Sequence, residues 1–197
     1  MKPVCLVLGA GAGIGGTVAA KFAQEGYHSS LCRRSDKEGL DRLVKNIEDQ
    51  GGSANGYIMN AIEDNAIEEV ITSIESDIGP IEVLVYNLGA QTGMKLLDQT
   101  SHKEFEWGWR MASFGLFRAA KVLCPLMLER GKGTFLVTSA TAAMRGNMNQ
   151  HSHAAAMGAR RMLCQSLNAE FSSQGIHVVH IVAVSYTHLT LPTIYSV

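Results

Sequence analysis

The most informative part of the sequence is Gly9-Ala10-Gly11-Ala12-Gly13-Ile14-Gly15-Gly16. It follows the apolar run 4–8, and apolar residues recur after it at helical spacing, at Val18 and Phe22. Glycines let the backbone turn sharply and approach a phosphate closely, while the free N–H groups and the dipole of a following helix attract negative charge. The order of strand, glycine turn and helix predicts a phosphate-binding turn. The alternative is an ordinary glycine-rich connection between a strand and a helix.

The composition is that of one globular domain. The chain has 197 residues, of which 46% are hydrophobic and 18% are charged, and this length suffices for a sizeable core. The net charge of -1 gives no electrostatic case for binding nucleic acid or an acidic membrane surface. We find no apolar run long enough to span a bilayer and no signal-peptide pattern. We therefore expect neither a nucleic-acid partner nor a membrane anchor.

The cysteines are far apart in the sequence and form no Cys-x-x-Cys pair. Two of the four lie in apolar, strand-like runs, so we expect reduced thiols in the core rather than disulfides or zinc ligands. Reduced thiols are typical of a cytoplasmic protein. No metal site is expected. The cysteines are Cys5, Cys32, Cys124 and Cys164.

Strand-like runs alternate with amphipathic helical stripes along the chain. Strands are expected at 4–8, 28–32, 53–59, 81–86, 134–138 and 176–184. Two helices carry a capping-box signal at their start, Ser35 with Glu38 and Ser101 with Glu104. The alternation predicts an α/β fold, a doubly wound parallel sheet with helices on both faces, in three layers. Such sheets bind ligands at the carboxyl ends of their strands, where the glycine turn would lie.

Over residues 3–182 the chain resembles the short-chain dehydrogenase/reductase family. Gly9, Gly13 and Gly15 match the Gly-x-x-x-Gly-x-Gly motif of that family, with Ile14 in its usual place. The run 86–89, Tyr-Asn-Leu-Gly, falls where the family has Asn-Asn-Ala-Gly, and 167–170, Leu-Asn-Ala-Glu, matches the end of its catalytic helix. The resemblance implies a Rossmann-like fold that binds a nicotinamide dinucleotide through Gly9, Gly11, Gly13, Ile14, Gly15, Asn60, Ala61, Asn87 and Gly89.

The choice of cofactor follows from the residues after the second strand. An acidic residue that would hold the ribose 2′-hydroxyl belongs there, and this chain has Arg33 and Arg34 instead. A guanidinium binds a 2′-phosphate bidentately, so NADP(H) is favoured. Two solvated surface arginines are the alternative, and the nearby Asp36 leaves NAD(H) open. Asn60 stands where the family usually has an aspartate near the adenine.

The family's catalytic residues are not retained. Alignment through Glu170 places His153 at the tyrosine position and Met157 at the lysine position, with Ala140 and Ala112 at the serine and asparagine positions. Histidine is the one residue of these four that transfers protons near neutral pH. We therefore take His153 as the candidate catalytic residue.

Other residues near these positions leave alternatives open. Ser139 and Thr141 flank the empty serine position and offer hydroxyls, whereas Arg160 and Arg161 are expected to be set off around the helix. The alternative to a catalytic role is that His153, like the nearby His151, is simply a polar residue at the start of a helix.

The last residues do not fit the rest of the chain. The run 185–197 has no helical stripe and resembles a translated sequencing adapter, whereas the family continues with a Pro-Gly turn, a substrate loop and a last strand. We expect 1–184 to be an incomplete dinucleotide-binding domain that lacks this last strand and loop, and 185–197 to be a non-native tail.

Two functions remain open at this point. The resemblance implies an oxidoreductase that transfers hydride between NADP(H) and a small carbonyl or alcohol substrate. The empty catalytic positions favour a non-catalytic dinucleotide-binding protein instead. In either case the family implies a homo-oligomer, with the helix from Ser101 and the helix around Leu163 as the dimer face. Phe114, Phe117 and Met162 would add apolar surface there.

Overall fold

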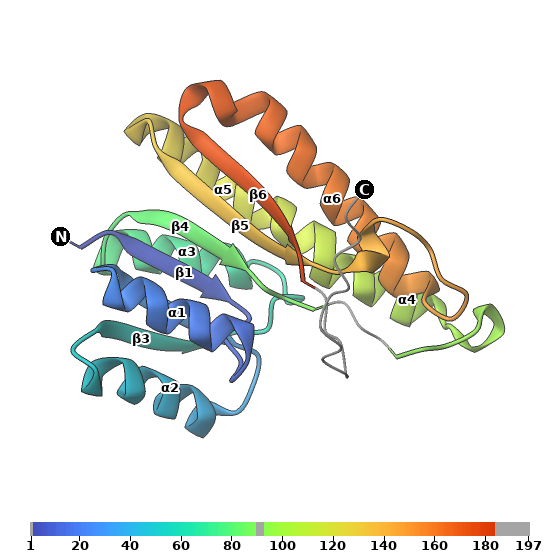
Figure 1. Ribbon diagram of the computed structural model, residues 1–197, viewed down its shortest axis with the longest axis horizontal. Helices are drawn as coiled ribbons and strands as arrows, with labels where there is room; N and C mark the ends of the chain where they lie inside the picture. Colours follow the sequence, from blue (N-terminus) through green and yellow to red (C-terminus); the bar gives the residue numbers. More distant parts are fainter. Residues whose placement is uncertain (1, 90–92, 184–197) are drawn as a thin grey trace, which may run out of the picture.

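The computed structural model describes residues 2–89 and 93–183, so the expected tail at 185–197 lies outside the described residues. A six-stranded parallel sheet has the order β3-β2-β1-β4-β5-β6 (Figure 1). Its first strand lies between the second and the fourth. The strands are β1 (Val4–Leu8), β2 (His28–Arg33), β3 (Ser53–Ile58), β4 (Ile81–Tyr86), β5 (Gly133–Ser139) and β6 (Ile176–Val182).

Helices cover both faces of this sheet, and two hydrophobic cores separate the three layers. The smaller core lies under α1 (Ile14–Gln24) and α2 (Lys37–Asp49). The larger core lies under α3 (Ala66–Asp77), α5 (Gly115–Arg130) and α6 (His151–Phe171). The three-layer, doubly wound fold expected from the sequence is therefore confirmed. Short 3₁₀ turns lie at Leu97–Gln99, Thr141–Ala143 and Ser172–Gln174.

The longest helix runs from 102 to 130 in three parts. It begins with α4 (His102–Trp109), passes through a π-helical segment at Arg110–Phe114 and continues as α5. Ser101 caps it as predicted, because its hydroxyl accepts the N–H of Glu104 while that carboxylate accepts the N–H of Ser101. By length and composition this helix is apolar enough to cross a membrane, which the sequence reading missed. Its most apolar window is 56% buried inside the protein, as in a core helix.

The start of α2 differs from the prediction. Asp36, rather than Ser35, caps this helix, since its carboxylate accepts the N–H of Gly39 at 2.9 Å. Asp36 has a positive φ of 62°, which moves the cap one residue along the chain. The same carboxylate also pairs with Arg33, at 3.0 Å. Asp36 can cap α2 and pair with Arg33 at the same time, which explains why it is the cap in place of Ser35.

The four cysteine thiols are free and buried. Burial raises the pKa of the Cys5 thiol to about 12 and those of Cys124 and Cys164 to about 11. Such thiols stay protonated at neutral pH and behave as small apolar side chains. Among residues 2–89 and 93–183 no three His, Cys, Asp or Glu side chains gather closely enough to hold a metal ion.

Candidate cofactor and active site

The glycine turn connects β1 to α1 at the carboxyl edge of the sheet. Gly9 has a φ of +95°, and a Cβ there would lie 2.7 Å from the carbonyl oxygen of Asn87. A Cβ at Gly15 would lie 2.3 Å from the carbonyl oxygen of Gly9. By contrast, a Cβ at Gly11 or Gly13 would meet nothing within 4 Å. A Cβ at Gly16 would lie 2.6 Å from the carbonyl oxygen of Gly11, so three glycines of the turn are required by packing. The other two, Gly11 and Gly13, face open space from which a ligand can approach the backbone.

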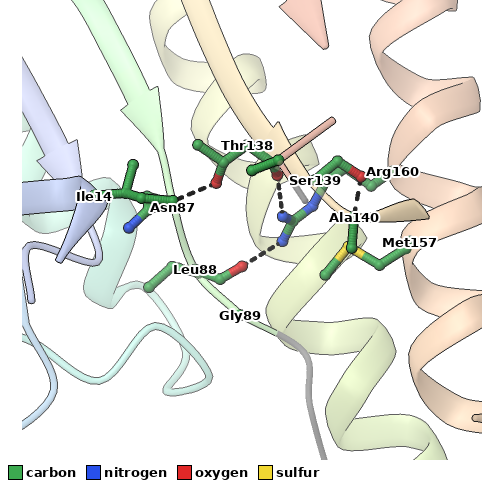
Figure 2. A pocket seen from close by; sticks show the side chains of 10 residues that line it. Ile14, Asn87, Leu88, Gly89, Thr138, Ser139, Ala140, Met157 and Arg160 are labelled. Carbon is green, nitrogen blue, oxygen red and sulfur yellow. Dashed lines mark hydrogen bonds between the residues drawn. The ribbon is translucent and has the colours of Figure 1, made fainter. Parts of the chain in front are cut away.

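Asn87 joins the glycine turn to the neighbouring strands. Its Nδ2 donates to the carbonyl oxygen of Gly9 at 2.9 Å, and its Oδ1 accepts the hydroxyl of Thr138 at 2.8 Å (Figure 2). The ends of β1, β4 and β5 are therefore held together by one amide side chain. This places Asn87, a residue that the resemblance assigns to the cofactor site, directly beside the glycine turn.

A pocket of about 290 Å³ opens at the end of β2, and we call it the β2 pocket. Both predicted arginines line it, but their surroundings differ. Arg33 forms the ion pair with Asp36, and its side chain is only 19% exposed. The guanidinium of Arg34 lies over the indole ring of Trp107, at 5.9 Å from the ring centre. The lining residues are Gly9, Gly11, Arg33, Arg34, Ser35, Asp36, Asn87, Leu88, Gly89 and Met111.

Asn60 and Ala61 lie outside that lining, after the end of β3. The Nδ2 of Asn60 donates to Glu63 at 3.0 Å, whereas its Oδ1 is buried and has no hydrogen-bond partner within the described part of the chain. The carbonyl oxygen of Ala61 accepts a hydrogen bond from Arg118 at 3.0 Å. A buried acceptor without a donor is costly unless a ligand supplies one. Asn60 therefore fits a ligand that carries an N–H group.

A second pocket of about 300 Å³, the central pocket, lies between β4, β5 and α6 (Figure 2). It shares three residues, Asn87, Leu88 and Gly89, with the β2 pocket. A single elongated ligand can therefore contact both. Ile14, from the first turn of α1, also lines the central pocket. The other lining residues are Thr138, Ser139, Ala140, Met157, Arg160 and Ala183.

The four aligned catalytic positions are distributed around the central pocket. Ala140 and Met157 line it, and Ala112 is fully buried. His153 is half-buried on α6 and is not among the lining residues. Because it precedes Met157 by four residues on one helix, both side chains lie on the same helical face.

The two hydroxyls that flank position 140 differ in their placement. The hydroxyl of Ser139 lines the central pocket and donates to the sulfur of Met157 at 3.8 Å. Thr141 is exposed at the start of a 3₁₀ turn. Of these two residues, Ser139 therefore offers its hydroxyl to a ligand in this pocket and Thr141 does not.

The predicted position of Arg160 is wrong. The sequence placed its side chain around the helix from the catalytic positions. It lines the central pocket and is only 1% exposed. Its guanidinium donates to the carbonyl oxygens of Leu88 (2.6 Å), Thr138 (2.7 Å) and Ala112 (2.9 Å) (Figure 2). Burial lowers the pKa of this group. The spacing 153, 157, 160 follows the i, i+4, i+7 pattern of one helical face, and this signal was available in the sequence.

Comparisons with known proteins agree on one family. The family model of the short chain dehydrogenases matches residues 3–190. A curated relative, the 3-oxoacyl-(acyl-carrier-protein) reductase of Thermotoga maritima, is 29% identical over 175 residues, which cover 89% of this chain and 70% of that protein.

Solved structures give the same result. The short-chain dehydrogenase of Rhodopseudomonas palustris is 30% identical, with a TM-score of 0.85 over 91% of this chain and 84% of that one. A gluconate 5-dehydrogenase of Burkholderia cenocepacia, solved with NADP and tartrate, is 25% identical, with a TM-score of 0.82 over 90% and 69% of the two chains.

Proposed function

Because this chain belongs to the short-chain dehydrogenase family, we propose that it is an NADP(H)-dependent oxidoreductase that acts on a small carbonyl or alcohol. The observation that carries the proposal is the glycine turn, where Gly11 and Gly13 face open space beside a pocket lined by Arg33 and Arg34. When bound, the dinucleotide supplies or accepts the hydride.

The residues of the site fit the parts of this cofactor. The N–H groups of the glycine turn and the start of α1 suit a pyrophosphate, because both present partial positive charge. The unpartnered Oδ1 of Asn60 suits the amino group of the adenine. The arginines of the β2 pocket suit a 2′-phosphate rather than a free hydroxyl. NAD(H) would leave Arg34 without an anionic partner, whereas Arg33 would keep its ion pair with Asp36.

His153 is the proposed acid and base of the reaction. It lies on the same face of α6 as Met157, one turn before it, and Met157 lines the central pocket. A positioned acid and base contributes about 10²–10⁴-fold to the rate. The His153→Ala variant should therefore lose carbonyl reduction with NADPH while it keeps the cofactor affinity of the unaltered chain.

The matched control for that variant is His151→Ala, a histidine in the first turn of the same helix. Reduction is measured as NADPH oxidation against a panel of small aldehydes, ketones and oxo acids. Turnover that survives in His153→Ala would remove this residue from the mechanism.

The second candidate function is dinucleotide binding without turnover. The observation that favours it is the central pocket itself, where Ala140 and Met157 stand at two catalytic positions and neither side chain transfers a proton. Arg160 has three of its N–H groups bound to main-chain carbonyls. NADPH binding without oxidation by any compound of the panel would establish this candidate in place of the first.

We also propose a cytoplasmic homo-oligomer whose subunits meet on α5 and α6. Phe117 and Met162 are 45% and 51% exposed on these helices, so each helix carries a large apolar side chain that a second subunit would cover. Phe114 stacks between Trp109 and Phe117, with ring centres 5.1 and 6.4 Å apart. Light scattering at micromolar concentration tests the assembly, and the mass of a monomer would contradict it.

A further inference from the structure

We propose that Trp107 is a positioning residue for NADP(H), in that its indole ring holds the guanidinium of Arg34 ready for the 2′-phosphate. The inference rests on the proposed function, because it assumes that the dinucleotide occupies the β2 pocket. It extends that function by separating the two arginines and by adding an aromatic residue from α4 that the sequence did not single out.

The two arginines differ in their availability to an anion. Arg33 is bound to the carboxylate of Asp36, which also caps α2, so a phosphate would have to compete with an existing ion pair. Arg34 has no hydrogen bond or ion pair to any of the described residues. Its guanidinium lies over the face of the Trp107 ring. Arg34 is therefore the cation in this pocket whose charge is not already compensated.

An indole face and a phosphate can bind one guanidinium at the same time. The N–H donors of arginine lie in the plane of the group, whereas its aromatic contacts are made through the face. The contact with Trp107 thus leaves the donors of Arg34 available. It also restricts the rotamers of a long side chain before binding, which lowers the entropy lost when a phosphate is held.

Trp107 is not a lining residue of the β2 pocket, but the helix places it next to one. Met111, four residues further along the continuous helix, lines the β2 pocket. Residues four apart lie on the same helical face, so Trp107 lies on the side of α4 that faces the end of β2. Its 39% exposure leaves part of the indole open to a ligand.

The test compares two nucleotides that differ only in the 2′-phosphate, 2′,5′-ADP and 5′-AMP. Calorimetry on the full chain should show that Trp107→Ala weakens 2′,5′-ADP about two- to fivefold, the range for an exposed cation–π contact. The affinity for 5′-AMP should not change. Trp107→Phe should retain most of the affinity, because a phenyl ring supplies the same kind of face.

The second tryptophan provides the matched control. Trp109 lies two residues away, is similarly exposed at 43% and stacks on Phe114 rather than on an arginine. Trp109→Ala should leave the ratio of the two nucleotide affinities unchanged. Since the chain has only two tryptophans, Trp109→Phe leaves Trp107 as its single indole fluorophore. Its emission should respond to 2′,5′-ADP more than to 5′-AMP.

Three results would contradict the inference, and they can be told apart. An unchanged affinity for 2′,5′-ADP in Trp107→Ala would overturn the inference and leave the proposed function intact. An equal loss for both nucleotides would mean that Trp107 supports the pocket generally, which also overturns it. Failure of both nucleotides to bind the unaltered chain would overturn the proposed function, and the inference with it.

Discussion

Substitution of the glycines by alanine separates their packing role from their ligand-binding role. At Gly15 a Cβ would lie 2.3 Å from the carbonyl oxygen of Gly9, 2.9 Å from the Cα of Ala10 and 3.0 Å from the Nδ2 of Asn87. Two of these three neighbours are main-chain atoms, so the turn itself must shift. At Gly11, which also lines the β2 pocket, the same Cβ would meet nothing within 4 Å.

The expected magnitudes follow from these contacts. Overpacking costs about 1–3 kcal/mol. Loss of the hydrogen bond from Asn87 to Gly9 adds about 0.5–1.5 kcal/mol. Gly15→Ala should therefore lower the free energy of unfolding by about 2–4 kcal/mol, which for a chain of this size lowers Tm by about 5–15 °C. Gly11→Ala should stay within about 0.5 kcal/mol of the unaltered chain.

The assays are thermal unfolding by circular dichroism and NADPH titration on the same samples. Gly11→Ala should weaken NADPH binding without a loss of stability, because its methyl group would occupy the space from which the pyrophosphate approaches the backbone. Equal stability of the two variants would refute the packing argument. Unchanged NADPH affinity in Gly11→Ala would refute the assignment of the turn to the phosphates.

Three further outcomes follow from buried polar groups. Arg118→Met should cost about 1–3 kcal/mol in urea unfolding, because Glu68 loses its ion pair and the carbonyl oxygen of Ala61 loses its donor; an unchanged midpoint would contradict this. The hydrogen bonds from Arg118 lower the pKa of Glu68 from its ordinary 4.5, so this carboxylate stabilises the fold above pH 4.5 and the contribution is lost as the pH falls through the lowered value. Thermal scans between pH 3 and 7 should show that loss, and it should be smaller in Arg118→Met. The buried thiols should react with dithionitrobenzoate only on unfolding, and fast labelling of the native chain would disprove their burial.

The fold could be predicted from the sequence because its periodic signals are strong. Continuous apolar runs such as Val4–Leu8 mark buried parallel strands, and the glycines and the cap at Ser101 mark the ends of helices. The cap of α2 was predicted wrongly. Ser35 and Asp36 both carry suitable oxygens, and the choice between them depends on the positive φ of Asp36 and on its pairing with Arg33.

The site could be predicted only in part. The glycine turn and the arginines of the β2 pocket were found because each belongs to a short sequence motif. The buried position of Arg160 depends on three carbonyl oxygens from β4, β5 and the long helix, which only the tertiary fold brings together. The contact between Arg34 and Trp107 likewise joins residues 73 positions apart. No local sequence pattern predicts a contact between residues so far apart in the chain.

We propose above that this chain binds NADP(H) in preference to NAD(H) through the cations of the β2 pocket. The most direct test is titration of the unaltered chain with NADPH and with NADH, by calorimetry at one salt concentration. A charge-assisted contact to the 2′-phosphate contributes about 1.5–3 kcal/mol, so NADPH should bind about tenfold or more tightly than NADH. Equal dissociation constants for the two cofactors would contradict the account.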